Sequence, residues 1–400
     1  MRGRTNVGDG VSLNANTANK YVAAGQITAG DFVEYYSEPT YIEQSSGQAT
    51  FRFNVGSYLV GLKNNEVVLY KEDEQVSSYS GYSVSEICKY GNFIVFRSSG
   101  TVGVLEIQND QLVLVDAESA SGTCICAADG KVVLLTLTSR SSYYYITAGY
   151  VFDISNAGEL SNGKSTTYGS EEYYVGPTSS VNGISSIGLV YVDSEEAFYT
   201  YSKLGTSSSA NPYNYKAEVD AENNISLTRT IYGGITLYDL MGQFGSRIIF
   251  RASQGVGSYD VVSGSGSLFQ IDGYKPGIID GNLFVAYKII NSTTMNARLY
   301  YYDSQANNIS LLDEYTFAYT NVGTYSNITG YNNTTKYVYI PLYTSASLRL
   351  LVVIDDNKIQ DIPDQDKVKP YTTGGNPIGV AKTNGNIGDT IPIYVPTPTV

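Results

Sequence analysis

Histidine and tryptophan are both absent from this chain of 400 residues. Without histidine the chain cannot form Ser–His or Cys–His nucleophile pairs, histidine-ligated zinc sites or the usual proton shuttle of neutral pH. No motif in the sequence specifies a reaction. The sequence therefore predicts a protein that is not an enzyme and that carries no cofactor, and its function has to be inferred from its architecture.

Cysteine is scarce, with only Cys88, Cys124 and Cys126. On an alternating strand Cys124 and Cys126 point to the same face, but two close thiols and one distant thiol do not supply a tetrahedral metal site. We expect three buried, reduced thiols that pack as small apolar side chains, and no metal site. The absence of a disulfide framework favours assembly in a reducing cytoplasm.

Basic residues and long apolar runs are also few. Lys and Arg number 25 against 38 Asp and Glu, which leaves a net charge of −13. Such a chain repels phosphate backbones and anionic lipid headgroups, so neither nucleic acid nor a membrane surface is an expected partner. No run approaches 18 apolar residues, and no apolar segment follows Arg2 and Arg4, so neither membrane insertion nor a secretory signal is predicted.

Turn-forming residue pairs recur along the chain and precede short β-rich segments. The pentapeptide NNISL occurs at residues 223–227 and again at 307–311. Asn, Asp and Gly tolerate the positive φ that tight hairpin turns require. Equivalent pairs stand at Asn64-Asn65, Asn109-Asp110, Ala157-Gly158, Ser265-Gly266 and Asp356-Asn357.

The seven turns are spaced 42 to 66 residues apart, and five of the six spacings lie between 42 and 49. Several short strands in a unit of about 40–50 residues are typical of a β-propeller blade. The sequence thus predicts an all-β chain with a seven-bladed propeller over residues 41–369. The longest spacing contains residues 165–180, which we expect to form an extended loop. A pair of two-sheet sandwiches is the rival interpretation of the same strands.

The two ends of the chain resemble each other. Gly30-Asp31 is followed by Phe32-Val33, and Gly388-Asp389 is followed by Thr390-Ile391, each opening an alternating segment that ends in Tyr. Neither end has enough apolar residues to fold alone. We expect residues 1–40 and 370–400 to pair as one small β-barrel, with Pro363, Pro370 and Pro377 in the linker that leaves the propeller.

The C-terminal segment IGVAKTNGNIGDTIPIYV resembles the terminal stretch of small β-barrel modules in tailed-bacteriophage virion proteins, and VAAGQITAGDFVEY is similar to the opening half of such modules. The resemblance covers about 35–40 residues and does not extend to the propeller. It implies a structural or adhesive virion component on the head or tail surface, assembled in the host bacterial cytoplasm. The barrel would bind other virion proteins, the chain would form a symmetric homo-oligomer on the particle, and a host-surface glycan is a candidate partner.

Two other functions remain open at this point. A carbohydrate-binding or glycan-cleaving propeller would need two carboxyl groups close together, and the candidates are Glu171, Glu172, Asp193, Glu195 and Glu196. An intracellular scaffold protein is the third alternative. For contacts with sugars or proteins the best surface candidates are Tyr143, Tyr144, Tyr145, Tyr173 and Tyr174, because tyrosine supplies a large rigid contact area at low entropic cost.

Overall fold

The computed structural model describes residues 19–37, 39–43, 48–169, 171–178, 183–204, 213–230, 239–252, 255–318, 329–342, 347–354, 357–371, 377–381 and 384–394. The chain divides into two compact units. One combines residues 1–40 with residues 361–400, and the other spans Tyr41–Gln360.

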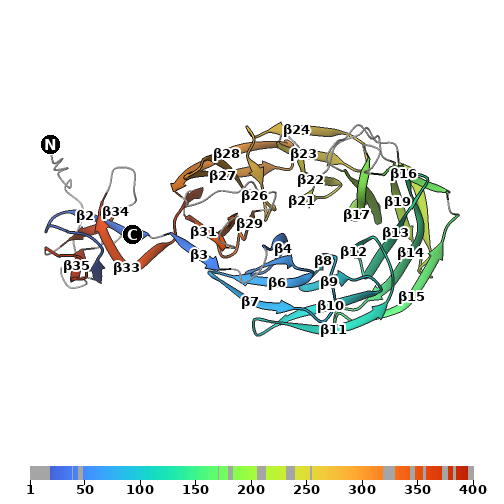
Figure 1. Ribbon diagram of the computed structural model, residues 1–400, viewed down its shortest axis with the longest axis horizontal. Coiled ribbons are helices and arrows are strands. Elements are labelled where there is room, and N and C mark those ends of the chain that lie inside the picture. Colours follow the sequence, from blue (N-terminus) through green and yellow to red (C-terminus); the bar gives the residue numbers. More distant parts are fainter. Residues whose placement is uncertain are drawn as a thin grey trace. The chain divides into compact units, whose positions relative to one another are not determined.

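The larger unit is a seven-bladed β-propeller, in which seven sheets follow one another around a ring (Figure 1). The first strand of each sheet lies toward the inside of the ring and the last strand lies on the rim. The first four blades are β4–β7 (Thr50–Val55, Tyr58–Lys63, Glu66–Lys71, Glu74–Tyr79), β8–β11 (Glu86–Tyr90, Phe93–Arg97, Thr101–Gln108, Gln111–Ser119), β12–β16 (Cys124–Ala128, Lys131–Arg140, Tyr143–Ile154, Leu160–Thr167, Tyr173–Pro177) and β17–β20 (Ile184–Val192, Ala197–Leu204, Asn214–Val219, Ile225–Thr230). The last three are β21–β24 (Asp239–Phe244, Arg247–Ala252, Gly255–Asp260, Gly266–Gln270), β25–β28 (Lys275–Pro276, Leu283–Asn291, Thr294–Asp303, Asn308–Ala318) and β29–β32 (Gly330–Tyr331, Tyr337–Leu342, Ser347–Ile354, Lys358–Gln360) with β3 (Thr40–Glu43).

Separate radial sheets confirm the propeller and exclude the sandwich interpretation. Among the described residues, six pairs of neighbouring blades each bury an apolar cluster of their own, as between blades 3 and 4, where Val133, Leu135, Leu189 and Phe198 are buried together. In the described part of the chain helical structure is limited to the short 3₁₀ turn η2 (Asp193–Glu195) and to Asn357, and no helix there is long and apolar enough to cross a bilayer.

Five of the seven predicted turns join the third and fourth strands of a blade, and in the sixth, Asp356-Asn357, the described residue Asn357 directly precedes β32 while Asp356 lies outside the described residues. The exception is Asn64-Asn65, which joins the second and third strands of blade 1. Blade 1 makes the equivalent turn with Glu72-Asp73, where Glu72 has a φ of 51°. The prediction missed this turn because glutamate is not a usual turn residue. Asparagine is a favoured one, and Asn64 and Asn65 have φ values of 51° and 64°, so the prediction chose their turn instead.

The two NNISL segments recur because their first asparagine fixes one blade to the one before it. Asn223 has a φ of 61°, and its amide donates to the carbonyl of Asn162 in blade 3 at 3.0 Å. Asn307 has a φ of 49°, and its amide donates to the hydroxyl of Ser267 in blade 5 at 3.1 Å. The same residue type therefore meets the backbone requirement of the turn and supplies a contact between blades.

Residues 165–180 were expected to form an extended loop, and this expectation is wrong in part. Tyr173–Pro177 form the strand β16, which pairs with the first half of β14, while β15 pairs with its second half. The twelve-residue β14 is long enough to present two successive edges, so the additional residues widen blade 3.

The ring closes where blade 7 meets the first strands of the propeller. Blade 7 takes β3 as a strand beside β31. On its other side Tyr339 packs against Phe51 and Tyr70 of blade 1, with ring centroids 5.8 and 6.0 Å apart, and all three rings are fully buried. The Tyr339 hydroxyl also donates to the carbonyl of Glu72 at 2.8 Å. Residues almost 270 positions apart in sequence thus form one packed seam.

Glycines opposite aromatic side chains recur within the blades. Gly257 pairs with Phe250, and Gly103 pairs with Phe96, across neighbouring strands. A Cβ at either glycine would overlap the ring of the aromatic partner. Because glycine has no side chain, the aromatic ring of its partner can occupy the space beside it.

The smaller unit is a closed five-stranded barrel in the order β1-β33-β2-β34-β35, with β1 (Asn19–Ala23), β2 (Phe32–Ser37), β33 (Pro363–Pro370), β34 (Pro377–Ala381) and β35 (Thr390–Tyr394). Its small core contains Ala23, Ile27, Val33, Val368 and Ile393. The expected small barrel made from both chain ends is thus present.

The boundary of the barrel differs from the one predicted. Residues 361–369 were assigned to the propeller and to a linker, whereas β33 lies between β1 and β2 of the barrel. Pro363 and Pro370 misled the prediction. They stand at the two ends of β33, where a strand tolerates the missing N–H group.

Candidate functional site

The barrel is built from two equivalent halves. Gly30 and Gly388 both have a φ of 90°, and the carboxylates of Asp31 and Asp389 accept the N–H of the residue three positions earlier, at 2.9 and 2.8 Å. A positive φ at the third position defines a type II turn, for which glycine is the suitable residue.

The same equivalence extends beyond the turns. Ala23 accepts the N–H of Gly388 at 2.7 Å, and Ala381 accepts the N–H of Gly30 at 2.8 Å. Every matched pair is 358 positions apart in sequence, so β1 corresponds to β34 and β2 corresponds to β35. The two chain ends therefore form the two halves of one module, and neither half closes without the other.

Large apolar side chains remain exposed on the barrel. Ile387, at the tip of the second Gly-Asp turn, is 78% exposed. Phe32 and Tyr371 are 39% and 38% exposed, and the N–H of Tyr371 donates to the carbonyl of Phe32 at 2.8 Å. Covering an exposed isoleucine at a turn tip with another surface removes apolar area from water and so lowers the free energy.

The five tyrosines predicted as surface candidates divide between two faces of blade 3. Tyr174 contacts Tyr143 and Tyr145 at centroid distances of 5.6 and 5.7 Å, and Tyr143 is 43% exposed. These three rings form a contiguous aromatic cluster. Tyr144 and Tyr173 instead pack against the apolar cluster between blades 3 and 4, because side chains alternate along a strand.

The aromatic cluster continues into blade 4. Tyr213 contacts Tyr174 at 5.5 Å, and the Arg229 guanidinium lies 3.3 Å from the centre of the Tyr213 ring. A row of tyrosine rings that ends in an arginine is chemically suited to contacts with sugars or protein surfaces.

The carboxylate clusters lie in different blades. Glu171 and Glu172 lie between β15 and β16 of blade 3, where Glu171 is 4.0 Å from Arg140 and Glu172 accepts the N–H of Gly169 at 3.1 Å. Asp193 and Glu195 lie in η2 of blade 4, where Glu195 is 3.6 Å from Lys216. Each cluster takes part in local contacts of its own blade.

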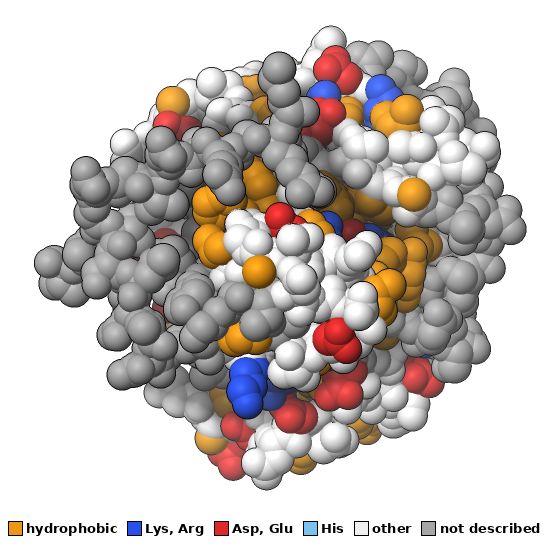
Figure 2. Space-filling model, turned by 90° about the vertical axis from the view of Figure 1, so that its left-hand side faces the viewer, with side chains coloured by type: hydrophobic (Ala, Val, Ile, Leu, Met, Phe, Trp, Pro, Cys, Tyr) orange, Lys and Arg blue, Asp and Glu red, His pale blue; other side chains and the backbone are white. Residues whose placement is uncertain are grey.

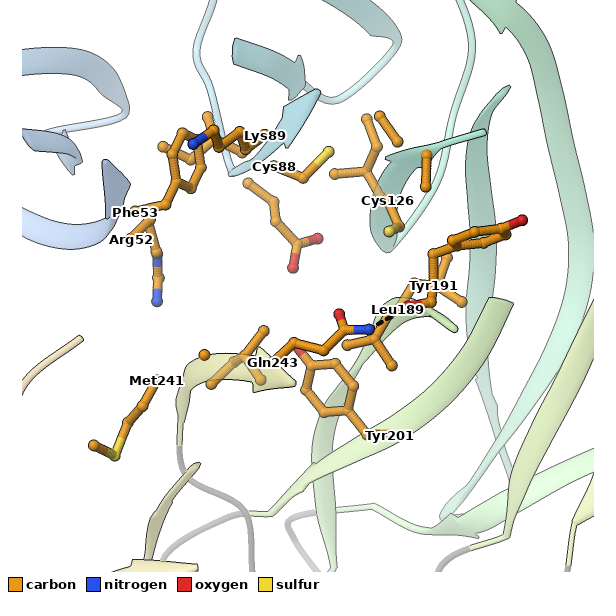
Figure 3. Close-up of a pocket in the computed structure, with 18 of the residues that line it drawn as sticks. Arg52, Phe53, Cys88, Lys89, Cys126, Leu189, Tyr191, Tyr201, Met241 and Gln243 are labelled. Atoms are coloured by element: carbon orange, nitrogen blue, oxygen red, sulfur yellow. Dashed lines mark hydrogen bonds between the residues drawn. The ribbon is translucent and has the colours of Figure 1, made fainter. Parts of the chain in front are cut away.

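A cavity of about 530 Å³ lies at the centre of the propeller, between the innermost strands of blades 1 to 5 (Figure 3). Figure 3 shows Arg52 and Gln243 extending into it, with Tyr201 below them and Cys88 and Cys126 on the opposite wall. The sequence analysis did not find this site, because its lining residues come from strands far apart in the chain.

Two ion-pair groups lie beside this cavity. Glu86 of blade 2 forms ion pairs with Arg97 of the same blade at 3.2 Å and with Lys203 of blade 4 at 3.1 Å. Asp239 pairs with Arg251 and lies 3.7 Å from Arg52. In each group a single carboxylate is shared by two cations.

Burial and neighbouring groups shift the pKa of three side chains in and near this cavity. Burial raises the pKa of Tyr201 to about 12. Burial tends to lower the pKa of Lys203, but the effects of Tyr201 and Glu86 outweigh burial. The net shift of the Lys203 pKa is therefore upward, and the amine stays charged. Burial and the nearby Arg251 both lower the pKa of Lys275, which stands at the start of β25. The residues that line the cavity include three cations and three carboxylates, so their formal charges balance: Arg52, Lys89 and Lys203 against Glu86, Asp193 and Asp239.

All three cysteines are free, but the expectation that all three are buried holds only for Cys124, because Cys88 and Cys126 are half-buried. Cys124 is fully buried, and Cys124 and Cys126 both pack toward the cluster between blades 3 and 4, which confirms their shared face. Among the described residues no group of three or more side chains is arranged to hold a metal ion.

Charge on the outer surface follows the composition. In the face shown in Figure 2, red Asp and Glu side chains are scattered, and the blue Lys and Arg side chains of the described residues do not gather into a large patch.

No protein-family model and no curated protein matches this chain. Among solved structures, the chain is similar to the WD40 domain of SCAP from fission yeast, at 10% identity over 92% of this chain and 99% of that chain, with a TM-score of 0.38. It is also similar to the C-terminal WD40 domain of Sif2, at 9% identity over 84% and 99%, with a TM-score of 0.38. A third similar structure is dihydro-heme d1 dehydrogenase NirN in complex with DHE, at 12% identity over 90% and 79%, with a TM-score of 0.40. These identities and TM-scores are too low to transfer a ligand, partner or activity to this chain.

Proposed function

We propose that this chain is a non-enzymatic structural or adhesive component of a bacteriophage particle, attached through its terminal barrel and carrying the propeller as an accessory domain. The observation that supports the proposal is the two-half barrel. The segments that resemble virion β-barrel modules are the ones that pair through the matched Gly-Asp turns.

The order of the two units along the chain also supports an attachment role for the barrel. Both chain ends are used in the barrel, and the propeller is inserted between its two halves. The apolar side chains exposed on the barrel, with Ile387 the most exposed, offer a contact for other virion proteins. Repeated copies on a symmetric particle would each use the same contact.

Mass spectrometry of purified particles tests this function directly. The proposal predicts that the chain is present at a fixed stoichiometry. It further predicts that removing residues 377–400, which include β34 and β35, abolishes incorporation while the propeller remains folded. A truncated chain that enters particles at normal stoichiometry would refute the attachment role, and a soluble chain absent from particles would favour the scaffold alternative.

A carbohydrate-binding role is the second candidate, and the aromatic cluster of Tyr143, Tyr145 and Tyr174 favours it. It is compatible with a virion protein that touches a host-surface glycan. Replacing Tyr143 with alanine should weaken adsorption to host cells but leave incorporation unchanged. Adsorption that is unaffected by this change would remove the cluster from the contact surface.

A further inference from the structure

Blade 3 departs from the four-stranded pattern of blades 2 and 4 through the additional strand β16. This strand pairs with the part of β14 that β15 leaves unpaired on the same edge. In repeat proteins, insertions into single repeats often build the binding face. The side chains that β16 brings to the surface are therefore candidates for a ligand contact.

Hydrogen bonds also connect β16 to blade 4. The N–H of Tyr213 donates to the carbonyl of Val175 at 2.8 Å, and the hydroxyl of Tyr215 donates to the carbonyl of Tyr174 at 2.6 Å. Blades 3 and 4 therefore support one continuous surface of aromatic rings. We call this surface the aromatic shelf, and it consists of Tyr143, Tyr145 and Tyr174 of blade 3 with Tyr213 and Arg229 of blade 4.

The exposed groups of the aromatic shelf suit a sugar better than a protein. Tyr143 and Arg229 are exposed, and the other three side chains are half-buried. Among the described residues of blades 3 and 4, Tyr143 is the one large apolar side chain that is exposed. A protein interface buries a contiguous apolar core, which this surface does not offer. A sugar ring instead has C–H groups on its face, for an aromatic ring, and hydroxyl groups at its edge, for the polar end of tyrosine.

Arg229 is the cation of the aromatic shelf. The central carbon of its guanidinium lies 3.3 Å from the centre of the Tyr213 ring. Stacking on the ring uses the flat face of the guanidinium and leaves the N–H donors at its edge, whose geometry matches a carboxylate. Within the described part of the chain no carboxylate forms an ion pair with Arg229, although the sequence contains 38 Asp and Glu.

The charges beside the aromatic shelf leave a small positive excess. Arg140 lies directly opposite Tyr143 and forms a 4.0 Å ion pair with Glu171. Glu172 lies beside Tyr173, on the opposite face of β16. The arginines at the two ends of the shelf are thus accompanied by one carboxylate on the same face. The net charge of the whole chain acts weakly here, because salt at physiological concentration screens charges over about 8 Å.

We propose that the aromatic shelf binds a glycan that carries a carboxylate, with sugar rings stacked on the tyrosines and the carboxylate bonded to the edge of Arg229. This inference rests on the carbohydrate-binding role, the second candidate function given above. It does not depend on the attachment role of the barrel.

Titration calorimetry of the full chain with two matched pairs of oligosaccharides tests the inference. Trigalacturonate and sialyllactose carry carboxylates, and the methyl ester of trigalacturonate and lactose are their neutral counterparts. We expect at least one acidic oligosaccharide to bind, about tenfold or more tightly than its counterpart, because a charge-assisted bond is gained. Equal binding within a pair would overturn the inference and leave the carbohydrate-binding role standing. If none of the four binds, the inference is wrong, and host adsorption that still depends on Tyr143 would then indicate a protein partner.

Four variants locate the binding. Arg229→Gln should weaken binding of the acidic oligosaccharide by about tenfold, to the level of its neutral counterpart. Arg229→Lys keeps the charge without the planar donors and should restore part of the loss. Tyr143→Ala should weaken the binding of both members of the pair.

Lys358→Gln is the control for net charge, because it removes one positive charge from a 58% exposed side chain in blade 7 and should leave binding unchanged. The circular dichroism spectrum of each variant establishes that it is folded. Undiminished binding in Arg229→Gln, or an equal loss in Lys358→Gln, would contradict the assignment of Arg229 to the carboxylate.

Discussion

Replacing Tyr339 tests the seam that closes the propeller. The Tyr339 ring is fully buried against Phe51 and Tyr70, and its hydroxyl donates to the carbonyl of Glu72 at 2.8 Å. Tyr339→Phe removes only this hydrogen bond and should lower the free energy of unfolding by about 1 kcal/mol. Tyr339→Ala also removes the buried ring and leaves a cavity, so we expect a loss of about 3–5 kcal/mol.

Urea-induced unfolding, followed by circular dichroism and tyrosine fluorescence, measures both losses. Tyr301→Ala is the matched control, since Tyr301 is 39% exposed in β27 and its removal should cost less than about 1 kcal/mol. If Tyr339→Ala costs no more than the control, blade 1 and blade 7 are not packed as described. Equal losses for the alanine and phenylalanine variants would show that the ring contributes nothing beyond its hydroxyl.

Three further predictions concern the blades, the acid response and the barrel. Gly257→Ala should destabilise the propeller by about 1–3 kcal/mol in the same unfolding assay, because the new Cβ overlaps the Phe250 ring, and Phe250→Leu should restore part of the loss. An additive double variant would exclude this contact. Hydrogen bonds from Tyr58 and Lys71 hold the pKa of Asp110 below its ordinary value; burial tends to raise the pKa of Asp153, but bonds from Lys131, Asn162 and Asn223 lower it overall. A carboxyl with a lowered folded-state pKa stabilises the fold above its ordinary pKa, and this contribution is lost as the pH falls through the folded-state value. The thermal midpoint should therefore be nearly constant from pH 7 to 5 and fall below about pH 4, with a smaller fall in Asp153→Asn; an identical fall in that variant would exclude Asp153. Ile387→Asp should reduce incorporation into particles without changing the thermal midpoint, whereas Leu268→Asp, at a propeller position that is 52% exposed, should leave incorporation normal; equal incorporation of the two variants would exclude Ile387 from the attachment contact.

The repeat architecture was predictable because turn chemistry is local. Asn109-Asp110 and the two NNISL segments occupy backbone conformations that few other residues adopt, so their spacing reports the blades. Glu72 was not recognisable as a turn residue, and β16 was missed because its pairing depends on the unusual length of β14.

The functional candidates were harder to predict because they depend on alternation and on distant contacts. Tyr144 and Tyr173 differ from their neighbours only in the face to which they point. Arg52 and Asp239 belong to strands in blades 1 and 5 that no local pattern connects. The sequence did indicate the matched Gly-Asp turns, because both halves of the barrel repeat the same local requirement for positive φ.

Quantitative mass spectrometry of purified phage particles, with the full chain and the chain lacking residues 377–400 expressed side by side, tests the central claim most directly. The account predicts that the full chain is present at a constant ratio to the major structural proteins and that the truncated chain is absent. Absence of the full chain from particles, or equal incorporation of the truncated chain, would contradict it.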